Sequence, residues 1–284
     1  MERPTADLVL LGDNLEVLPR FADGSFQLVY TDPPFNTGGT VRRRTLEVVR
    51  DDKGERVGFQ GRRYSARLVA QSSFGDSFDD YLGFLEPRLR EAHRLLAPTG
   101  TLYLHLDYRE AHYAKVLLDE VFGRGCFLNE LVWAYDYGAK SRRRWPAKHD
   151  TILVYVKDPD AYYFDSEAVD REPYMAPGLV TAEKAARGKL PTDVWWHTIV
   201  SPTGAEKTGY PTQKPEGVLR RMVQASSRAG DWCLDPFAGS GTLGVVAAKL
   251  GRRYVLVDSS AEAVDTARAR LARLTGEPER VGEV

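Results

Sequence analysis

Cysteine is scarce in this sequence, which contains only Cys126 and Cys233 among its 284 residues. Neither has a second cysteine or a histidine at the spacing of a metal site, so the sequence predicts neither a metal centre nor a disulfide framework. Both lie in apolar or loop surroundings along the chain. We interpret them as reduced packing residues of a cytoplasmic protein, in preference to a catalytic thiol.

Long apolar runs and a secretion signal are also missing. No stretch approaches the roughly 20 apolar residues of a membrane-spanning helix, and the opening Met1–Pro4 does not begin a signal peptide. Hydrophobic content of 43% and charged content of 28% are ordinary for a globular protein. We therefore expect either one large domain or one domain with an elaborated insert, and no contact with a membrane.

The chain carries almost no net charge, −1 at pH 7, so a nucleic-acid partner must be argued from where the charges lie. Residues 39–76 have no helical apolar period and are predicted to form a basic loop insert, in which residues 45–49 and 56–60 pair as a hairpin. Such a loop can be merely solvated, but its arginines also suit backbone phosphates. The predicted contacts are Arg42, Arg43, Arg44, Arg62 and Arg63.

A second basic cluster lies between residues 140 and 149. Here Arg142, Arg143 and Arg144 precede Trp145. This mixture of cations with an aromatic ring suits phosphate contact combined with base stacking. The alternative is that Trp145 is a packing anchor for its loop.

Two consecutive prolines follow the short apolar strand 26–30. They prevent both further strand pairing and a helix, so the chain must turn sharply at Asp32-Pro33-Pro34-Phe35. The strand 7–11 and a short helix from Asn14 precede it, which makes a parallel βαβ unit. Open α/β sheets place ligands at the carboxyl ends of such strands. A carboxylate, a prolyl carbonyl and an aromatic face can together hold a planar group with an exocyclic NH₂, although a simple proline turn with a packed phenylalanine is the plainer alternative.

A glycine-rich turn far downstream favours the ligand-binding interpretation. Asp235-Pro236-Phe237-Ala238-Gly239-Ser240-Gly241-Thr242 follows the strand 232–234 and precedes a helix, and the next strand, 254–257, ends at Asp258. This layout is typical of a Rossmann-like nucleoside site, where glycine backbone approaches the ligand and an acid binds the ribose. No lysine follows Gly241, so the turn is not a P-loop.

The charge of the glycine turn selects among nucleoside ligands. Gly244 completes the glycine spacing of a dinucleotide site, but Asp235 would place a negative charge where the pyrophosphate must lie. A ligand with a cationic amino acid end fits better. S-adenosylmethionine has one, with its adenosine at Asp258 and its amino group and sulfonium at Asp235.

The remaining chain predicts further elements of an α/β fold. Helices are expected over 78–96, 110–122, from 215 onward, over 242–250 and at the C-terminus, and strands over 101–106, 128–135 and 151–157. Residues 158–210 keep no period, and the adjacent Trp195 and Trp196 are interpreted as core residues.

In both motifs and in their order, the chain resembles the β-class amino-methyltransferases that act on DNA. The resemblance covers nearly all of residues 7–275, including Gly12-Asp13, Leu104–Asp107, His149-Asp150 and Thr212–Pro215. It implies an α/β, Rossmann-like methyltransferase fold with a seven-stranded, mostly parallel sheet that has one reversed strand and is circularly permuted. It also implies a catalytic domain of residues 1–157 and 208–284, with a small target-recognition insert at 158–207.

The same resemblance implies roles for individual residues. Asp32, Pro33, Pro34 and Phe35 would be catalytic. The implied cofactor-binding residues are Asp13 near the adenine, Asp32, Thr212, Gln213 and Lys214 at the amino acid end, Asp235, Phe237, Ala238, Gly239, Ser240, Gly241 and Thr242 in the turn, and Asp258 at the ribose. From its position alone, Asp13 is equally suited to cap the helix that follows it.

We therefore expect a site-specific methyltransferase that methylates N6 of an adenine flipped out of double-stranded DNA. The resemblance favours adenine over N4 of cytosine, because the cytosine enzymes of this family usually carry serine before the two prolines, where this chain has Asp32. The alternatives are a cytosine enzyme, an RNA or small-molecule amino-methyltransferase, and a catalytically silent DNA-binding protein. The resemblance is also consistent with a homodimer and with a restriction endonuclease partner.

Overall fold

The structure is a computed structural model that describes residues 1–50, 56–57, 63–201 and 204–275, and in residues 39–75 it describes the backbone alone. The chain divides into two compact units. One comprises Met1–Phe35 with Asp80–Val284, and the other comprises Asn36–Asp79.

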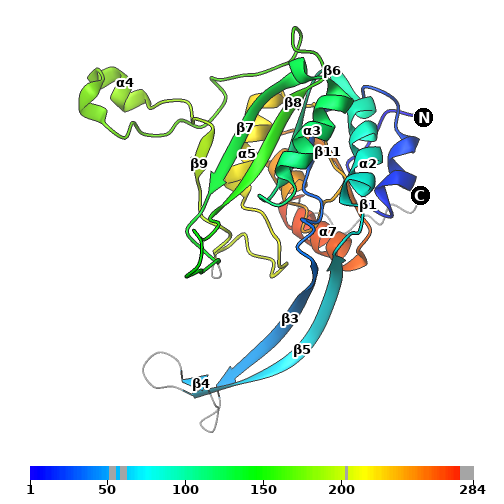
Figure 1. The fold of residues 1–284 in the computed structure, drawn as a ribbon, viewed down its shortest axis with the longest axis vertical. Helices are drawn as coiled ribbons and strands as arrows, with labels where there is room; N and C mark the ends of the chain where they lie inside the picture. Colours follow the sequence, from blue (N-terminus) through cyan, green and yellow to red (C-terminus); the bar gives the residue numbers. More distant parts are fainter. Residues whose placement is uncertain (51–55, 58–62, 202–203, 276–284) are drawn as a thin grey trace. The chain divides into compact units, whose positions relative to one another are not determined.

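The larger unit is built on an eight-stranded sheet (Figure 1). In spatial order its strands are β1 (Leu8–Leu11), β11 (Arg253–Asp258), β10 (Trp232–Asp235), β2 (Phe26–Thr31), β6 (Leu96–Leu106), β8 (His149–Val156), β7 (Phe127–Ala134) and β9 (Val194–Trp196). Only β8 is reversed among these strands, because it pairs antiparallel with both β6 and β7. The expected methyltransferase sheet is confirmed: all seven predicted strands are present, and β9 adds an eighth by pairing with β7.

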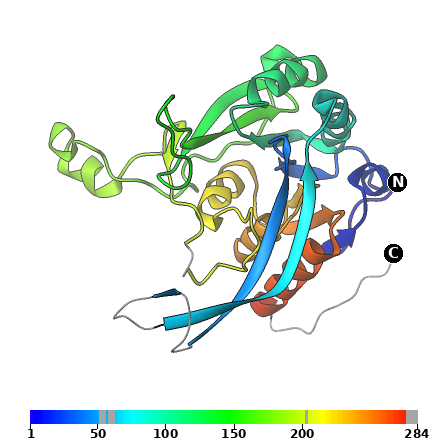
Figure 2. The ribbon, with the colours of Figure 1, turned by 60° about the horizontal axis from the view of Figure 1, so that its bottom comes forward.

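Helices cover both faces of this sheet. They are α1 (Asn14–Val17), α2 (Tyr81–Leu95), α3 (Ala111–Phe122), α5 (Glu216–Ser226), α6 (Thr242–Lys249) and α7 (Ala261–Thr275). A further short helix, α4 (Ala182–Arg187), lies on an arm that projects away from the sheet (Figure 1). The C-terminal helices α5, α6 and α7 share one core with the sheet, whereas α2 and α3 lie on the other face (Figures 1 and 2). Cover on both sides explains why all six residues of β2 are buried.

The permuted order of the strands positions the site. The C-terminal strand β10 inserts beside the N-terminal strand β2, with Cys233 opposite Leu28 and Leu234 opposite Val29. The two strands are parallel, so their carboxyl ends lie side by side at one edge of the sheet. The proline turn and the glycine turn begin at those ends.

The smaller unit is a three-stranded antiparallel sheet in the order β3-β5-β4, formed by β3 (Gly39–Arg50), β4 (Arg56–Val57) and β5 (Arg63–Asp76). The segment predicted as a loop is therefore mainly strand. The predicted hairpin is wrong, because β3 pairs with β5 from Gly39 opposite Asp76 to Arg50 opposite Tyr64, and β4 also pairs with β5. Clustered arginines hide the two-residue period that would have indicated the longer pairing.

The irregular segment before α5 holds a short strand and a helix that the sequence did not predict, β9 and α4. On β9 Trp195 is buried, as expected, but Trp196 is 75% exposed. The prediction that both tryptophans belong to the core is wrong for Trp196, since successive residues of a strand face opposite sides. Within the described residues, no helix combines the length and apolarity needed to cross a membrane.

Candidate active site

The carboxylate of Asp32 lies at the first turn beyond β2 and has two different surroundings. Its Oδ2 accepts a hydrogen bond from Lys214 Nζ at 2.5 Å, in an ion pair whose side chains are only 14% and 11% exposed. Its Oδ1 is buried and has no hydrogen-bond partner among the described residues. The Lys214 ammonium also lies 4.8 Å from the centre of the Phe35 ring. The ends of β2 and of the segment before α5 thus meet at one carboxylate.

A buried polar network lies behind Asp32 and centres on His105 of β6, which is fully buried. Its Nε2 is 3.2 Å from Asp150 Oδ2, and its Nδ1 is 2.8 Å from the hydroxyl of Tyr30. A carboxylate can only accept, so in the neutral ring Nε2 donates to Asp150 and the Tyr30 hydroxyl donates to Nδ1. Nδ1 is also 4.0 Å from Asp32 Oδ1, and in this tautomer it has no proton to offer that oxygen. Sequence reasoning gave His105 no role of its own.

The network continues to the surface of a cavity. Asp150 Oδ1 accepts a hydrogen bond from the Tyr135 hydroxyl at 3.0 Å. Burial acts to raise the pKa of Asp150, but its hydrogen bonds from His105 and Tyr135 and the positive charge of Lys214 outweigh burial, so the pKa lies below its usual value. Burial, with the charges of Asp32, Asp235 and Asp150, raises the pKa of Tyr30 well above its usual value and keeps its hydroxyl protonated.

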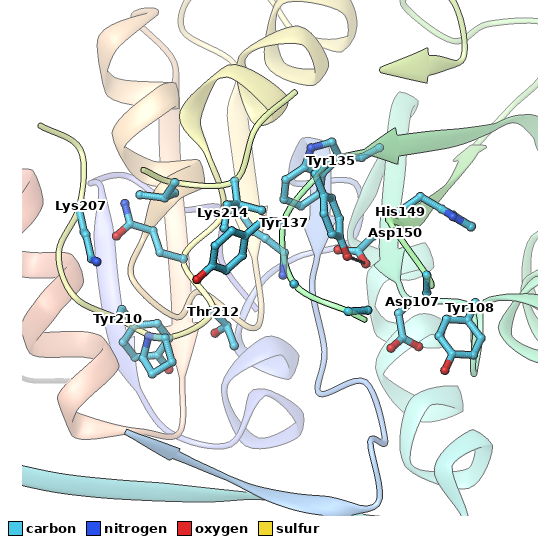
Figure 3. A pocket seen from close by; sticks show the side chains of 18 of the residues that line it. Asp107, Tyr108, Tyr135, Tyr137, His149, Asp150, Lys207, Tyr210, Thr212 and Lys214 are labelled. Carbon is cyan, nitrogen blue, oxygen red and sulfur yellow. Dashed lines mark hydrogen bonds between the residues drawn. The ribbon is translucent and has the colours of Figure 1, made fainter. Parts of the chain in front are cut away.

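The cavity itself has a volume of about 590 Å³, within the roughly 300–1,000 Å³ of typical ligand sites. Aromatic side chains dominate its wall: Tyr108, Trp133, Tyr135, Tyr137 and Tyr210. Figure 3 shows Asp107, His149 and Asp150 on one side, Lys207, Tyr210 and Thr212 on the other, and Lys214 between them. The wall therefore combines flat apolar faces with a few charged groups, which suits a planar polar ligand.

The two glycines of the downstream turn serve different neighbours. Gly239 has a φ of +49°, and a Cβ there would lie 3.3 Å from the ring of Tyr210, a residue of the cavity wall. Gly241 has a φ of +73°, and its Cβ would lie 2.7 Å from Cβ of Ala267 on α7. Both contacts are with the protein itself, so the close approach of these glycines to a ligand stays a prediction. Gly241 allows α7 to pack closely against the turn.

Hydrogen bonds from Arg270 and Asn14, two residues that were not predicted to belong to the site, hold the glycine turn in place. Arg270, which is 8% exposed, donates to Thr242 Oγ1 at 2.9 Å, and Thr242 Oγ1 donates in turn to the backbone carbonyl of Lys214 at 3.2 Å. Asn14 Nδ2 donates to the Pro236 carbonyl at 3.0 Å. The predicted cofactor residues Ala238, Ser240 and Thr242 are buried. They therefore shape the turn, and its backbone rather than these side chains is available to a ligand.

Carboxylates gather beneath the turn and make it electrostatically negative. Asp235 is 2% exposed, and its pKa lies well above the usual value because of burial and the nearby charges of Asp32 and Asp258. Its Oδ1 accepts the N–H of Phe237 at 3.0 Å. Burial also raises the pKa of Asp258, whose oxygens accept the N–H groups of Gly239 and Ser260. This field disfavours a pyrophosphate and favours a ligand with a positive charge.

Other predicted cofactor residues have identifiable structural partners. Asp13 is the N-cap of α1: it accepts the Leu15 N–H at 2.8 Å and pairs with Arg88 at 3.2 Å, which confirms the capping interpretation. Gln213 lines the cavity together with Thr212, and it donates to the Glu206 carbonyl at 2.6 Å. The ring of Phe237 packs 6.1 Å from Phe84 of α2.

The second basic cluster is exposed beside the cavity. Trp145 is 94% exposed, so the interpretation of this residue as a packing anchor is wrong. Arg144 donates to the hydroxyl of Tyr108, a residue of the cavity wall, at 3.3 Å. In the first basic segment, the backbone of Arg42, Arg43 and Arg44 forms part of β3 and that of Arg63 part of β5, whereas Arg62 lies outside the described residues.

The two cysteines are unpaired with each other, and burial raises the pKa of both. Cys233 is buried, which raises its thiol pKa to about 12, and burial also raises that of Cys126. Both are free thiols, and Cys233 packs in the core as expected. Among the residues that the structure describes, no three or more His, Cys, Asp or Glu side chains are grouped so that they could hold a metal ion.

Comparison with known proteins places the chain in one group. A family model described as DNA methylase matches residues 26–269. The Type II methyltransferase M.HpaI of Haemophilus parainfluenzae is 29% identical over 266 residues, which cover 93% of this chain and 73% of the relative. The DNA adenine methyltransferase YhdJ of Escherichia coli K12 is 27% identical over 274 residues, which cover 94% and 83%.

Solved structures share the fold. The M1.HpyAVI–SAM complex superposes with a TM-score of 0.60 at 21% identity and covers 93% of this chain and 98% of its own. The cytosine-N4-specific PvuII DNA methyltransferase superposes with a TM-score of 0.63 at 16% identity, covering 95% and 89%. The shared fold therefore does not distinguish an adenine enzyme from a cytosine enzyme.

Proposed function

The chain belongs to the N6/N4 family of DNA methylases, and on that premise we propose that it transfers a methyl group from S-adenosylmethionine to the exocyclic N6 of an adenine flipped out of double-stranded DNA. The observation that carries this proposal is the place of Asp32. A carboxylate, with Phe35 beside it, lies at the carboxyl end of a strand that pairs directly with the strand leading into the glycine turn. An amine held at Asp32 is therefore next to the cofactor turn.

The reaction needs help at the amine because the lone pair of an aryl NH₂ is delocalised into its ring. The carboxylate of Asp32 and the carbonyl of Pro33 accept the two N–H groups and draw the nitrogen toward tetrahedral geometry. The lone pair then points out of the plane of the base. When bound, S-adenosylmethionine supplies an electrophilic methyl group on a sulfonium. Methyl transfer would form a carbon–nitrogen bond as the carbon–sulfur bond breaks and S-adenosylhomocysteine leaves, and the methylated amine would pass one proton to the Asp32 carboxylate, from which water takes it.

The side chains around the cavity hold the flipped base in that geometry. Phe35 stacks on one face of the base, and the tyrosines and Trp133 of the wall exclude water. His105 fixes the Tyr30 hydroxyl and Asp150 behind Asp32. These residues position the reacting group and need no covalent bond to the base.

The residues of the glycine turn fit S-adenosylmethionine on two grounds. The backbone at Gly239 passes close to the cavity wall and has no side chain of its own, and the carboxylates Asp235 and Asp258 favour a cationic ligand. Asp258 binds the ribose hydroxyls, and Thr212, Gln213 and Lys214 hold the amino acid end. Because Asp235 is buried, it acts through its charge and through the shape of the turn.

The basic clusters and the irregular segment supply the DNA interface. Residues 142–144 contact backbone phosphates, and the exposed Trp145 stacks on a base or enters the space that the flipped base leaves. The arginines of 42–44 and 62–63 add further phosphate contacts. Residues 158–207 form the target-recognition region.

Replacement of Asp32 tests this function. We expect Asp32→Ala to lower the rate of methyl transfer to duplex DNA by at least about 100-fold, since it removes the group that orients the amine. Calorimetric titration should find cofactor binding nearly intact. Activity comparable to wild type in this variant would contradict the assignment, and methylation of RNA or free nucleosides in preference to DNA would indicate the alternative substrate class.

A further inference from the structure

The Lys214 side chain contacts both groups that are proposed to bind the flipped base, the carboxylate of Asp32 and the ring of Phe35. Its ammonium is 2.5 Å from Asp32 Oδ2 and 4.8 Å from the centre of the Phe35 ring. The first group is the acceptor for the amine and the second is the stacking surface. A base that stacks on this side of Phe35 and donates its amine to Asp32 Oδ2 must therefore compete with the ammonium for the same place.

The second carboxylate oxygen of Asp32, Oδ1, is not available to the amine. Oδ1 is inaccessible to solvent, and it lies 4.0 Å from His105 Nδ1 on the buried side of the carboxylate. An incoming amine must therefore bind at Oδ2, where Lys214 now donates. The ion pair is mostly shielded from water, so removing the lysine without giving it another anion is costly.

The cofactor carries a suitable replacement anion. The backbone carbonyl of Lys214 is tied to Thr242 of the glycine turn, so the lysine is anchored beside the cofactor site while its side chain can swing. The buried acids of that turn already accept backbone N–H groups: Asp235 from Phe237 and Asp258 from Gly239. The carboxylate at the amino acid end of the cofactor, when bound, would supply a new acceptor for the ammonium, because Lys214 is among the residues proposed to hold that end.

From this juxtaposition we propose that Lys214 makes base binding depend on the cofactor. In the free enzyme the lysine closes Asp32 and Phe35 to the base. When the cofactor is bound, its carboxylate pairs with the Lys214 ammonium, which leaves Asp32 and Phe35 open to the base. The enzyme then flips the base only after the methyl donor is in place. This inference rests on the proposed function and adds an order of binding to it.

Two adenosine thioethers separate this mechanism from simple occupancy of the site. S-adenosylhomocysteine has the amino acid carboxylate, whereas 5′-methylthioadenosine lacks it. The assay uses a duplex with 8-vinyladenine, a fluorescent adenine that keeps the 6-amino group, or a fluorescent cytosine that keeps its 4-amino group if cytosine is the target. The analogue stands at the methylated position mapped beforehand, because it brightens when it leaves the stack. For the wild-type protein we expect saturating S-adenosylhomocysteine to raise the fluorescence at least fivefold more than saturating 5′-methylthioadenosine. Equal increases would overturn the proposal.

Replacing the lysine gives the second arm of the experiment. Lys214→Met should flip the analogue without any cofactor, and the difference between the two thioethers should disappear. Lys115→Met is the matched control, since Lys115 also pairs with an aspartate, Asp119 at 2.7 Å, and lies 4.6 Å from the ring of Phe127. This control should keep the wild-type dependence. If Lys214→Met still requires S-adenosylhomocysteine, the role of Lys214 is refuted.

The possible outcomes distinguish a failure of the role of Lys214 from a failure of the proposed methyl transfer. A wild-type protein that methylates DNA but responds equally to both thioethers contradicts the role of Lys214 alone. A wild-type protein that methylates no DNA contradicts the proposed function. If Lys214→Met does not fold, the comparison of the two thioethers on the wild-type protein still decides.

Discussion

Replacing the buried His105 by leucine tests the polar network behind the site. The substitution His105→Leu fills most of the space of the ring with an apolar side chain and removes both ring nitrogens. The Tyr30 hydroxyl then loses the partner 2.8 Å away, and Asp150 Oδ2 loses the partner 3.2 Å away. Asp150 keeps its bond from Tyr135. The variant therefore contains two buried polar groups with too few partners.

The expected cost follows from those two groups. A buried polar group without its partner costs about 1–3 kcal/mol, so for two such groups we expect the free energy of unfolding at pH 7 to fall by about 2–6 kcal/mol. At roughly 2–4 °C per kcal/mol for a chain of this size, the melting temperature should fall by about 4–24 °C. Urea denaturation and thermal unfolding followed by circular dichroism measure both quantities.

The pH dependence of the loss adds a second check. The pKa of Asp150 is lower in the folded protein than its usual value, mainly because His105 outweighs the effect of burial. A lowered carboxyl pKa contributes stability above the unfolded pKa of about 3.9, and that contribution is lost as the pH falls toward the folded pKa. The difference between His105→Leu and wild type should therefore be largest near neutral pH and shrink below about pH 4.

The same substitution at the exposed His112 provides the control. His112→Leu should change the free energy of unfolding by no more than about 0.5 kcal/mol. If His105→Leu were as mild as this control, the network would contribute nothing and the reasoning would be refuted.

Three further predictions concern the DNA interface and the glycine turn. Replacing the arginines of 142–144 by serine should weaken DNA binding and reduce the slope of log K against log[salt] by up to about 2.7, one counterion term per phosphate; an unchanged slope in fluorescence anisotropy titrations would exclude phosphate contact there. Asp235→Asn should raise the melting temperature at pH 7–8, because folding raises the pKa of this acid and so makes its charged form costly. The gain should vanish below about pH 4, where the acid is protonated in both states. An equal gain at all pH values would contradict a charge effect. Gly241→Ala should destabilise the protein more than the control Gly251→Ala. Gly251 has a similar φ of +72°, so its replacement should cost only the backbone strain of about 1–3 kcal/mol, whereas at Gly241 the new Cβ also meets Ala267 at 2.7 Å. Equal losses in urea denaturation would show that backbone strain alone matters.

Much of the fold was predictable because its signals are local. Apolar runs and turn residues marked each of the seven central strands, and the two motifs at the ends of 26–30 and 232–234 are continuous in sequence. The pairing of β10 with β2 then brings both turns to one edge of the sheet. The identity of the residues at that edge could therefore be anticipated before their geometry was known.

The contacts that complete the site are long-range and were not predictable. The ion pair between Asp32 and Lys214 joins residues 182 positions apart, and the contact between Tyr30 and His105 spans 75. No periodicity or spacing records such partners. The exposure of Trp196 was missed for a different reason, because a strand of three residues is too short to display its two-residue alternation.

The central claim is tested most directly by identifying the methylated nucleoside. Duplex DNA is incubated with the purified protein and isotopically labelled S-adenosylmethionine, digested to nucleosides and analysed by mass spectrometry. The account predicts label in N6-methyldeoxyadenosine with wild-type protein and its loss with Asp32→Ala. Label in N4-methyldeoxycytidine would contradict the assignment of adenine, and unlabelled DNA would contradict the account as a whole.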